Sequence, residues 1–135
     1  MRRLVVLALF LAGGLLLTGI AAARVPTPSR VQTGIKTPSG NIVCNAGLYR
    51  GRPLVACTVL SKFDRRGQTT WAMHATGLVK TGFVLGNAAT DLPKLAYGRT
   101  WKWRGMRCTS RTPGLTCTNG SGHGFFLSRQ SQRIF

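Results

Sequence analysis

The apolar positions of this chain fall in short runs, and glycine or proline separates one run from the next. Leu54–Leu60 is a mostly apolar run, rich in β-branched residues and too short for a typical helix. Thr70–Ala75 alternates between apolar and polar residues, which is the pattern of a half-buried strand. Beyond residue 23, no segment combines a helical period with capping residues. The pattern predicts an all-β fold, a small antiparallel β-barrel or sandwich built from hairpins.

Thr100–Arg107 shows the alternation most clearly. If this segment is one strand, Trp101 and Trp103 lie on one face, whereas Lys102 and Arg104 lie on the other. A surface that stacks single-stranded nucleic acid needs aromatic and basic side chains on the same face. We therefore expect the tryptophans in the core and the charges in solvent. The other predicted strands are Ile42–Cys44, Gly77–Lys80, Gly82–Leu85 and His123–Arg129.

Cys108 and Cys117 bracket the turn sequence Arg111–Gly114. A hairpin centred on this turn places the two cysteines directly opposite each other. Directly opposed Cβ atoms lie ~4.5–5.5 Å apart, close to the ~3.5–4.5 Å that a disulfide requires. We therefore predict a Cys108–Cys117 disulfide across a hairpin.

Cys44 and Cys57 are symmetric about Arg50-Gly51, which predicts a second hairpin disulfide unless a bulge shifts the register. A zinc site is the alternative use of four cysteines, but Cys₄ zinc sites usually contain close pairs separated by ~2–4 residues. The wider spacing here favours two disulfides, no metal site and an oxidising compartment.

The N-terminus has the parts of a secretory signal. Arg2 and Arg3 precede the apolar stretch Leu4–Ile20, which ends at the small residues Ala21–Ala23. An uncleaved membrane anchor is the alternative, because an apolar segment of ~20 residues can span a bilayer. We expect cleavage near Ala23 and a secreted or periplasmic protein. The expected organisation is a signal peptide at 1–23, a linker at 24–33 and a single domain at 34–135.

The charge is strongly basic: 19 lysines and arginines face only 2 acidic residues, for a formal net charge of +17. Such a field attracts polyanions. Candidate partners are an anionic cell-envelope polymer, lipid headgroups or nucleic acid, bound by a monomer. The best candidate anion-binding residues are Arg99, Lys102, Arg104 and Arg107.

The sequence contains few residues that would form a catalytic site. Glycoside hydrolysis requires two carboxyl groups that flank the bond. The only acidic residues of the chain are Asp64 and Asp91, and both look like turn residues, which disfavours this chemistry. No nucleophile, base and orienting group form a recognisable set. We expect a non-catalytic protein without a cofactor. The alternative is a small secreted hydrolase, nuclease-like, that uses His123 and His74.

Several motifs resemble those of a family of secreted bacterial domains of unknown function. The segments are Thr37–Cys44, Leu95–Trp101 with its YGxxW element, Cys108–Asn119 and Gly122–Arg129. The resemblance covers roughly 34–135, nearly all of the chain beyond the leader. It implies an exported, disulfide-bonded, all-β domain, and it implies no established activity.

Overall fold

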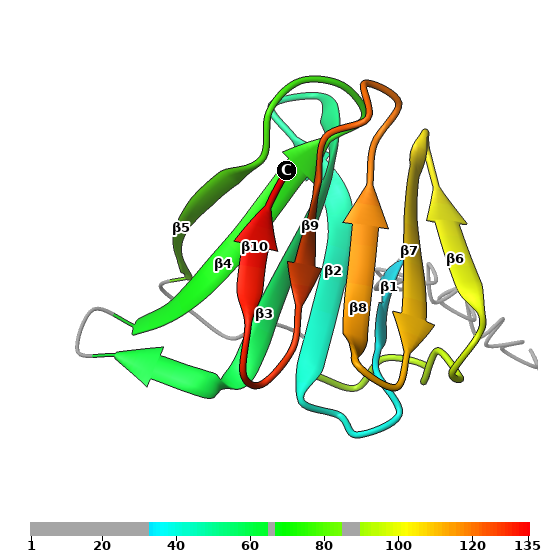
Figure 1. Cartoon of the computed structure of the whole chain (residues 1–135). Coiled ribbons are helices and arrows are strands. Elements are labelled where there is room, and N and C mark those ends of the chain that lie inside the picture. Colours follow the sequence, from blue (N-terminus) through cyan, green and yellow to red (C-terminus); the bar gives the residue numbers. More distant parts are fainter. Residues whose placement is uncertain (1–32, 65–66, 85–89) are drawn as a thin grey trace, which may run out of the picture.

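The computed structural model describes residues 33–64, 67–84 and 90–135, so the predicted signal peptide lies outside the described residues. The strands begin at Thr33, the last residue of the predicted linker. Within the described ranges all regular structure is β, and they contain no helix of the length and apolarity needed to cross a membrane. The strands form two separate five-stranded antiparallel sheets (Figure 1).

Each sheet is a meander in which consecutive strands pair, because short turns join antiparallel neighbours. The all-β prediction is confirmed, in the form of two open sheets rather than a closed barrel. The first sheet contains β1 (Thr33–Lys36), β2 (Ile42–Tyr49), β3 (Arg52–Asp64), β4 (Gly67–His74) and β5 (Lys80–Val84). The second contains β6 (Thr100–Trp103), β7 (Met106–Arg111), β8 (Gly114–Thr118), β9 (Gly124–Leu127) and β10 (Gln132–Ile134).

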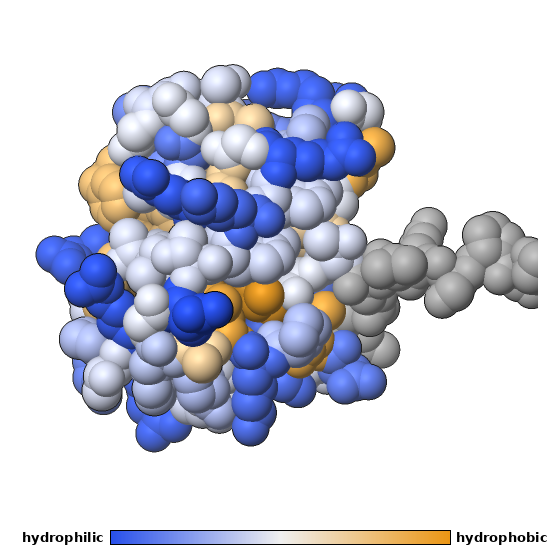
Figure 2. Space-filling model, turned by 90° about the vertical axis from the view of Figure 1, so that its right-hand side faces the viewer, coloured by the Kyte–Doolittle hydropathy of each residue, from blue (hydrophilic) through white to orange (hydrophobic). Residues whose placement is uncertain are grey.

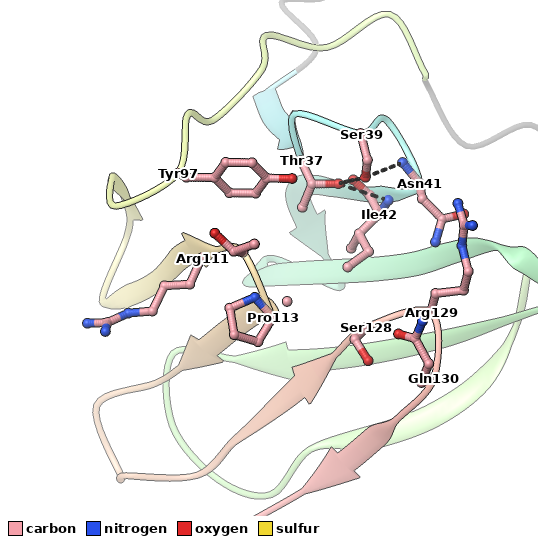
Figure 3. A pocket seen from close by; sticks show the side chains of 12 residues that line it. Thr37, Ser39, Asn41, Ile42, Tyr97, Arg111, Pro113, Ser128, Arg129 and Gln130 are labelled. Atoms are coloured by element: carbon pink, nitrogen blue, oxygen red, sulfur yellow. Dashed lines mark hydrogen bonds between the residues drawn. The ribbon is translucent and has the colours of Figure 1, made fainter.

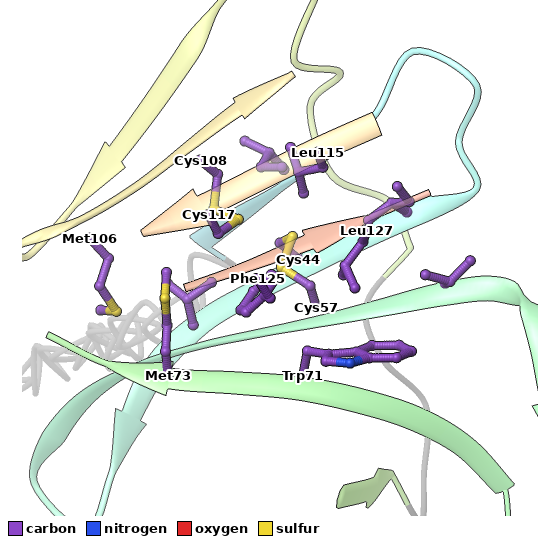
Figure 4. Packing of buried hydrophobic residues seen from close by; sticks show 14 residues of the cluster. Cys44, Cys57, Trp71, Met73, Met106, Cys108, Leu115, Cys117, Phe125 and Leu127 are labelled. Atoms are coloured by element: carbon purple, nitrogen blue, oxygen red, sulfur yellow. A yellow bond between two sulfur atoms is a disulfide. The ribbon is translucent and has the colours of Figure 1, made fainter. Parts of the chain in front are cut away.

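The hydrophobic core lies between the two sheets. Alternate residues along each strand face inward, as the period of two requires. The first sheet contributes Val55, Trp71 and Met73, and the second contributes Leu115 and Phe125. Figure 4 shows Trp71, Met73, Leu115 and Phe125 meeting between the layers.

Both predicted disulfides are present. Cys44 pairs with Cys57 and Cys108 pairs with Cys117, in each case across directly opposed strand positions with Cα atoms 4.0 Å apart. All four cysteines are completely buried. The two bonds come from different sheets and meet in the core, where the four Sγ atoms lie within 4.8 Å of one another (Figure 4). Each disulfide therefore closes a local hairpin, and the pair also joins the two sheets by contact.

Two predicted strands were wrong in extent. Gly77–Lys80 is not a strand of its own, because residues 77–79 belong to the connection between β4 and β5, and Lys80 begins β5. Thr100–Arg107 is not one strand but two, since the chain reverses at Arg104-Gly105. Both residues have positive φ, 41° and 85°, as a tight two-residue hairpin turn requires. The last strand, β10, had no counterpart among the predicted strands.

Ser110 supplies a test of the core. Its side chain is completely buried, and its Oγ has no hydrogen-bond partner in the protein. A buried hydroxyl without a partner costs about 1–3 kcal/mol in lost hydration. We expect Ser110→Ala to leave the free energy of unfolding unchanged or to raise it by about 1 kcal/mol.

Urea denaturation of Ser110→Ala and Ser128→Ala would check this prediction. Ser128 is also buried, but its hydroxyl donates to the Ser131 carbonyl at 3.2 Å and accepts from the Ser131 N–H at 2.9 Å. Its loss should therefore destabilise the protein. Equal destabilisation by the two variants would show that Ser110 has a partner after all.

Candidate functional site

The β6–β7 hairpin places two basic side chains side by side. Lys102 lies directly opposite Arg107, and Arg107 lies directly opposite Thr118 of β8. The neighbouring Cys108 faces the core, so these side chains point to the outer surface of the second sheet. Like charges on directly opposed positions repel each other. The chain thus holds a repulsive pair that a bound anion would relieve.

The pair borders a hollow of about 490 Å³. We call it the basic hollow. Its lining comes from the β6–β7 hairpin, from the last residue of β8 and from the chain just after β8, and it contains no carboxylate. The lining residues are Lys102, Trp103, Arg104, Gly105, Met106, Arg107, Thr118, Asn119 and Gly120.

Short contacts set the position of both arginines in the basic hollow. The Nε of Arg107 donates a hydrogen bond to Oγ1 of Thr118 at 2.9 Å. The guanidinium of Arg104 lies 5.6 Å from the ring centroid of Trp103, within the range of a cation–π contact. The basic groups are therefore held at the rim by neighbours that do not neutralise them.

The rim formed by Asn119 is tied to the first sheet. The side-chain amide of Asn119 donates to the carbonyls of His74 at 3.1 Å and Gly77 at 2.8 Å. Its oxygen accepts from the N–H groups of Ser121 at 3.0 Å and His123 at 3.2 Å. One buried side chain thus fixes the β8–β9 connection against the β4–β5 connection, and with it one wall of the basic hollow.

The structure brings together three of the four predicted anion-binding residues. Lys102, Arg104 and Arg107 are exposed and line the basic hollow. Arg99 is also exposed, but it precedes β6 and is not part of this lining. Trp101 and Trp103 are half-buried and pack against the core, which agrees with the expected separation of aromatic and basic side chains.

A second hollow, of about 190 Å³, lies at the opposite end of the strands. We call it the lower cleft. Figure 3 shows Tyr97 pointing across its mouth toward Thr37, while Arg129 lies beside Asn41. Arg111 points away from it (Figure 3). Its lining residues are Thr37, Ser39, Asn41, Ile42, Tyr97, Arg111, Thr112, Pro113, Gly114, Ser128, Arg129 and Gln130.

Much of the polar lining of the lower cleft serves its own turns. Thr37 Oγ1 accepts from the N–H of Ile42 at 3.2 Å, and Ser39 Oγ accepts from the N–H of Asn41 at 3.3 Å. The lower cleft takes residues from three segments that stand out as motifs, namely Thr37–Cys44, Leu95–Trp101 and Gly122–Arg129. The sequence alone does not indicate that these segments meet. The hydroxyl groups of the lower cleft are engaged locally, and its volume is smaller than that of the basic hollow. The basic hollow is therefore the stronger candidate for binding.

The two histidines line neither hollow. The Nδ1 of His74 lies 2.8 Å from the carbonyl oxygen of Pro53, and the backbone N–H of His123 is bonded to Asn119. The two residues do lie at the same end of the molecule, since Asn119 also bonds the carbonyl of His74. Neither hollow therefore brings an imidazole together with the basic residues.

The four cysteines are the one cluster of metal-ligating side chains found among the described residues. Their sulfurs are close enough together for a tetrahedral site, but each is bonded to its partner. A zinc ligand must be a thiolate. The oxidised protein therefore uses this cluster as cross-links.

Comparison with known proteins finds one match to a family model, over part of the chain. No curated protein and no solved structure matches the chain. The family model matches residues 83–135, which contain β6–β10, the basic hollow and the second disulfide, whereas the resemblance in the sequence motifs extends back to residue 34. The matching model is that of a family of unknown function, DUF6636.

Proposed function

We propose that this protein is an exported, non-catalytic binding module that holds an anionic partner in the basic hollow. The observation that carries the proposal is the directly opposed pair Lys102 and Arg107 beside Arg104, with no carboxylate in the lining. A phosphate or carboxylate group on the partner would replace like-charge repulsion with charge-assisted hydrogen bonds. The two disulfides support an oxidising compartment outside the cytoplasm.

The composition supports the same proposal at longer range. With a formal net charge of +17, the protein attracts polyanions from a distance, and the basic hollow supplies the place where they are held. The hydrolase alternative lacks such support, because neither His74 nor His123 belongs to the lining of the basic hollow or of the lower cleft.

The test is binding of a soluble polyanion, long-chain polyphosphate, at several salt concentrations. The variant Lys102→Gln/Arg104→Gln/Arg107→Gln should bind at least about tenfold more weakly than the parent in low salt. The slope of log affinity against log salt should also decrease by about 1 for each phosphate that the variant no longer neutralises.

A charge-matched control separates the site from the net charge. Lys62→Gln/Lys94→Gln/Arg133→Gln removes the same charge from exposed positions outside both hollows. It should bind nearly as well as the parent. Equal losses in the two triple variants, or binding that ignores salt, would contradict the proposal.

A further inference from the structure

One end of the sandwich is built from the β2–β3 turn, the β4–β5 and β8–β9 connections, the β6–β7 turn and the C-terminus. We call it the upper end, as it is drawn in Figure 1. Hydrogen bonds join the β4–β5 connection to the β8–β9 connection: the N–H of Gly120 donates to the carbonyl of Ala75 at 2.9 Å, and the N–H of Gly77 donates to Ser121 Oγ at 3.2 Å. The N–H of Phe135 donates to the carbonyl of Gly124 at 3.0 Å. The basic hollow opens at this end, because the β6–β7 turn and the β8–β9 connection form its wall.

The upper end collects exposed apolar side chains. Leu48 is 62% exposed, Tyr49 is 55% exposed and Leu78 is 70% exposed. Single exposed apolar residues are common on proteins and need no explanation. Here, however, most of those in the described residues share one end. The set at the upper end is Leu48, Tyr49, Leu78, Ile134 and Phe135, and the remaining two are Leu60 and Tyr97.

The strand register explains why Leu48 and Tyr49 are both exposed. His74, the last residue of β4, pairs with Leu54, so the β2–β3 hairpin continues past the end of the neighbouring strand. Successive strand residues point to opposite faces. Since neither face of this projecting tip is covered, both side chains reach solvent.

Basic residues lie at the same end, and the guanidinium of Arg50 is 5.6 Å from the ring centroid of Tyr49. Arg50 and Arg52 flank the hairpin tip, Arg104 lies in the β6–β7 turn, and all three are exposed. Figure 2 shows blue, hydrophilic side chains over both the upper and the lower part of one face, with orange apolar groups at its upper right edge and in its lower half. The two acidic residues of the chain lie toward the other end: Asp64 ends β3, and Asp91 adjoins Thr90, whose carbonyl accepts from Lys36 Nζ at 3.1 Å.

We propose that the upper end docks on the surface of an anionic lipid bilayer. The inference rests on the proposed anion-binding function and names its partner. Arginines at this end bind lipid phosphates, while Leu48, Tyr49 and Leu78 enter the layer between headgroups and acyl chains. A hydrophilic polymer would satisfy the arginines but would leave these apolar side chains in water. A bilayer offers phosphate groups at its surface and apolar chains beneath them, and tyrosine suits the boundary between these two layers.

The experiment measures binding of the protein to three targets. These are anionic vesicles made of mixed phosphatidylglycerol and phosphatidylcholine, neutral vesicles of phosphatidylcholine alone, and soluble polyphosphate. The protein is produced by export, and every variant carries the same N-terminus. Leu48→Ser/Leu78→Ser removes apolar area without changing charge, so its affinity for anionic vesicles should fall at least about tenfold. Its affinity for polyphosphate should stay that of the parent. Leu60→Ser is the matched control, because Leu60 is exposed near Asn41 at the lower end.

A second measurement locates the contact. Tryptophan emission of Leu48→Trp should shift to the blue and be quenched by brominated lipid, whereas the emission change of Leu60→Trp on vesicles should not exceed that of the parent. Full vesicle binding by Leu48→Ser/Leu78→Ser would overturn the bilayer inference, and so would binding of polyphosphate without binding of vesicles. Either result leaves the proposed function intact. A parent protein that binds neither polyphosphate nor anionic vesicles would refute both.

Discussion

Replacing Cys108 and Cys117 together by alanine is expected to lower the free energy of unfolding by about 3 kcal/mol. The disulfide joins residues with a sequence separation of 9, and it restricts the unfolded chain far more than the native one. Both residues are completely buried, so alanine also leaves a small space at the centre of the core. Urea denaturation of the oxidised parent and the double variant would measure the loss.

The two cysteines must be replaced together. A lone Cys117 thiol would lie within 4.8 Å of the sulfurs of Cys44 and Cys57. Its thiolate could attack that disulfide and release the other cysteine as the leaving thiolate. A single Cys108→Ala variant is therefore expected to give mixed cross-links, which peptide mapping under non-reducing conditions would detect.

The other disulfide provides the comparison. Removing Cys44 and Cys57 together should cost a similar amount, because their separation of 13 encloses a loop of nearly the same entropy. Loss of both bonds should cost about 6 kcal/mol, comparable with the whole stability of many domains of this size. A cost below about 1 kcal/mol for either pair would show that the hairpins need no cross-link.

Replacing Phe125 by alanine should cost about 3–5 kcal/mol, which would make it among the most destabilising single substitutions in this chain. Phe125 is completely buried, and its backbone pairs with Cys117, so its ring packs between the sheets beside the disulfides (Figure 4). The cavity that alanine leaves cannot close easily, because the cross-linked hairpins around it resist collapse. Chemical denaturation would measure the change.

Phe126→Ala is the matched control. Phe126 has the same chemistry one residue later, but it faces the outer surface, where the Arg133 guanidinium lies 5.1 Å from its ring centroid. Because its ring is only half-buried, its loss should cost far less, about 1 kcal/mol. Equal costs at the two positions would contradict the strand register of β9.

The two hairpin disulfides were predictable because each depends on a short stretch of chain. Cys108 and Cys117 flank one turn, and Cys44 and Cys57 flank another, so the symmetry of the sequence about each turn sets the pairing. The turn at Arg104-Gly105 was missed, although Arg50-Gly51 marks the same kind of turn. Both pairs have positive φ at both residues. Arginine is seldom found at the first of these positions, where asparagine or aspartate is usual.

The missed turn changed the candidate site more than it changed the fold. On a single strand, Lys102 and Arg104 would be neighbours on one face. In the observed hairpin, Lys102 instead faces Arg107 directly, and Arg104 occupies the turn beside them. The hairpin thus places Lys102, Arg104 and Arg107 at one hollow, and the repulsive pair among them comes from the reversal of the chain.

Local sequence patterns were sufficient to predict the all-β fold class, the cysteine pairing and the inward alternation of Trp101 and Trp103. These depend on residues close together in the chain, where turn chemistry and the period of two leave few alternatives. The meeting of the two disulfides and the contact of Asn119 with the first sheet follow from the packing of the sheets and are not apparent from the sequence. The packing of the sheets also places most of the exposed apolar side chains of the described residues at one end of the strands. Such contacts join distant segments, and their geometry follows from how the two sheets pack.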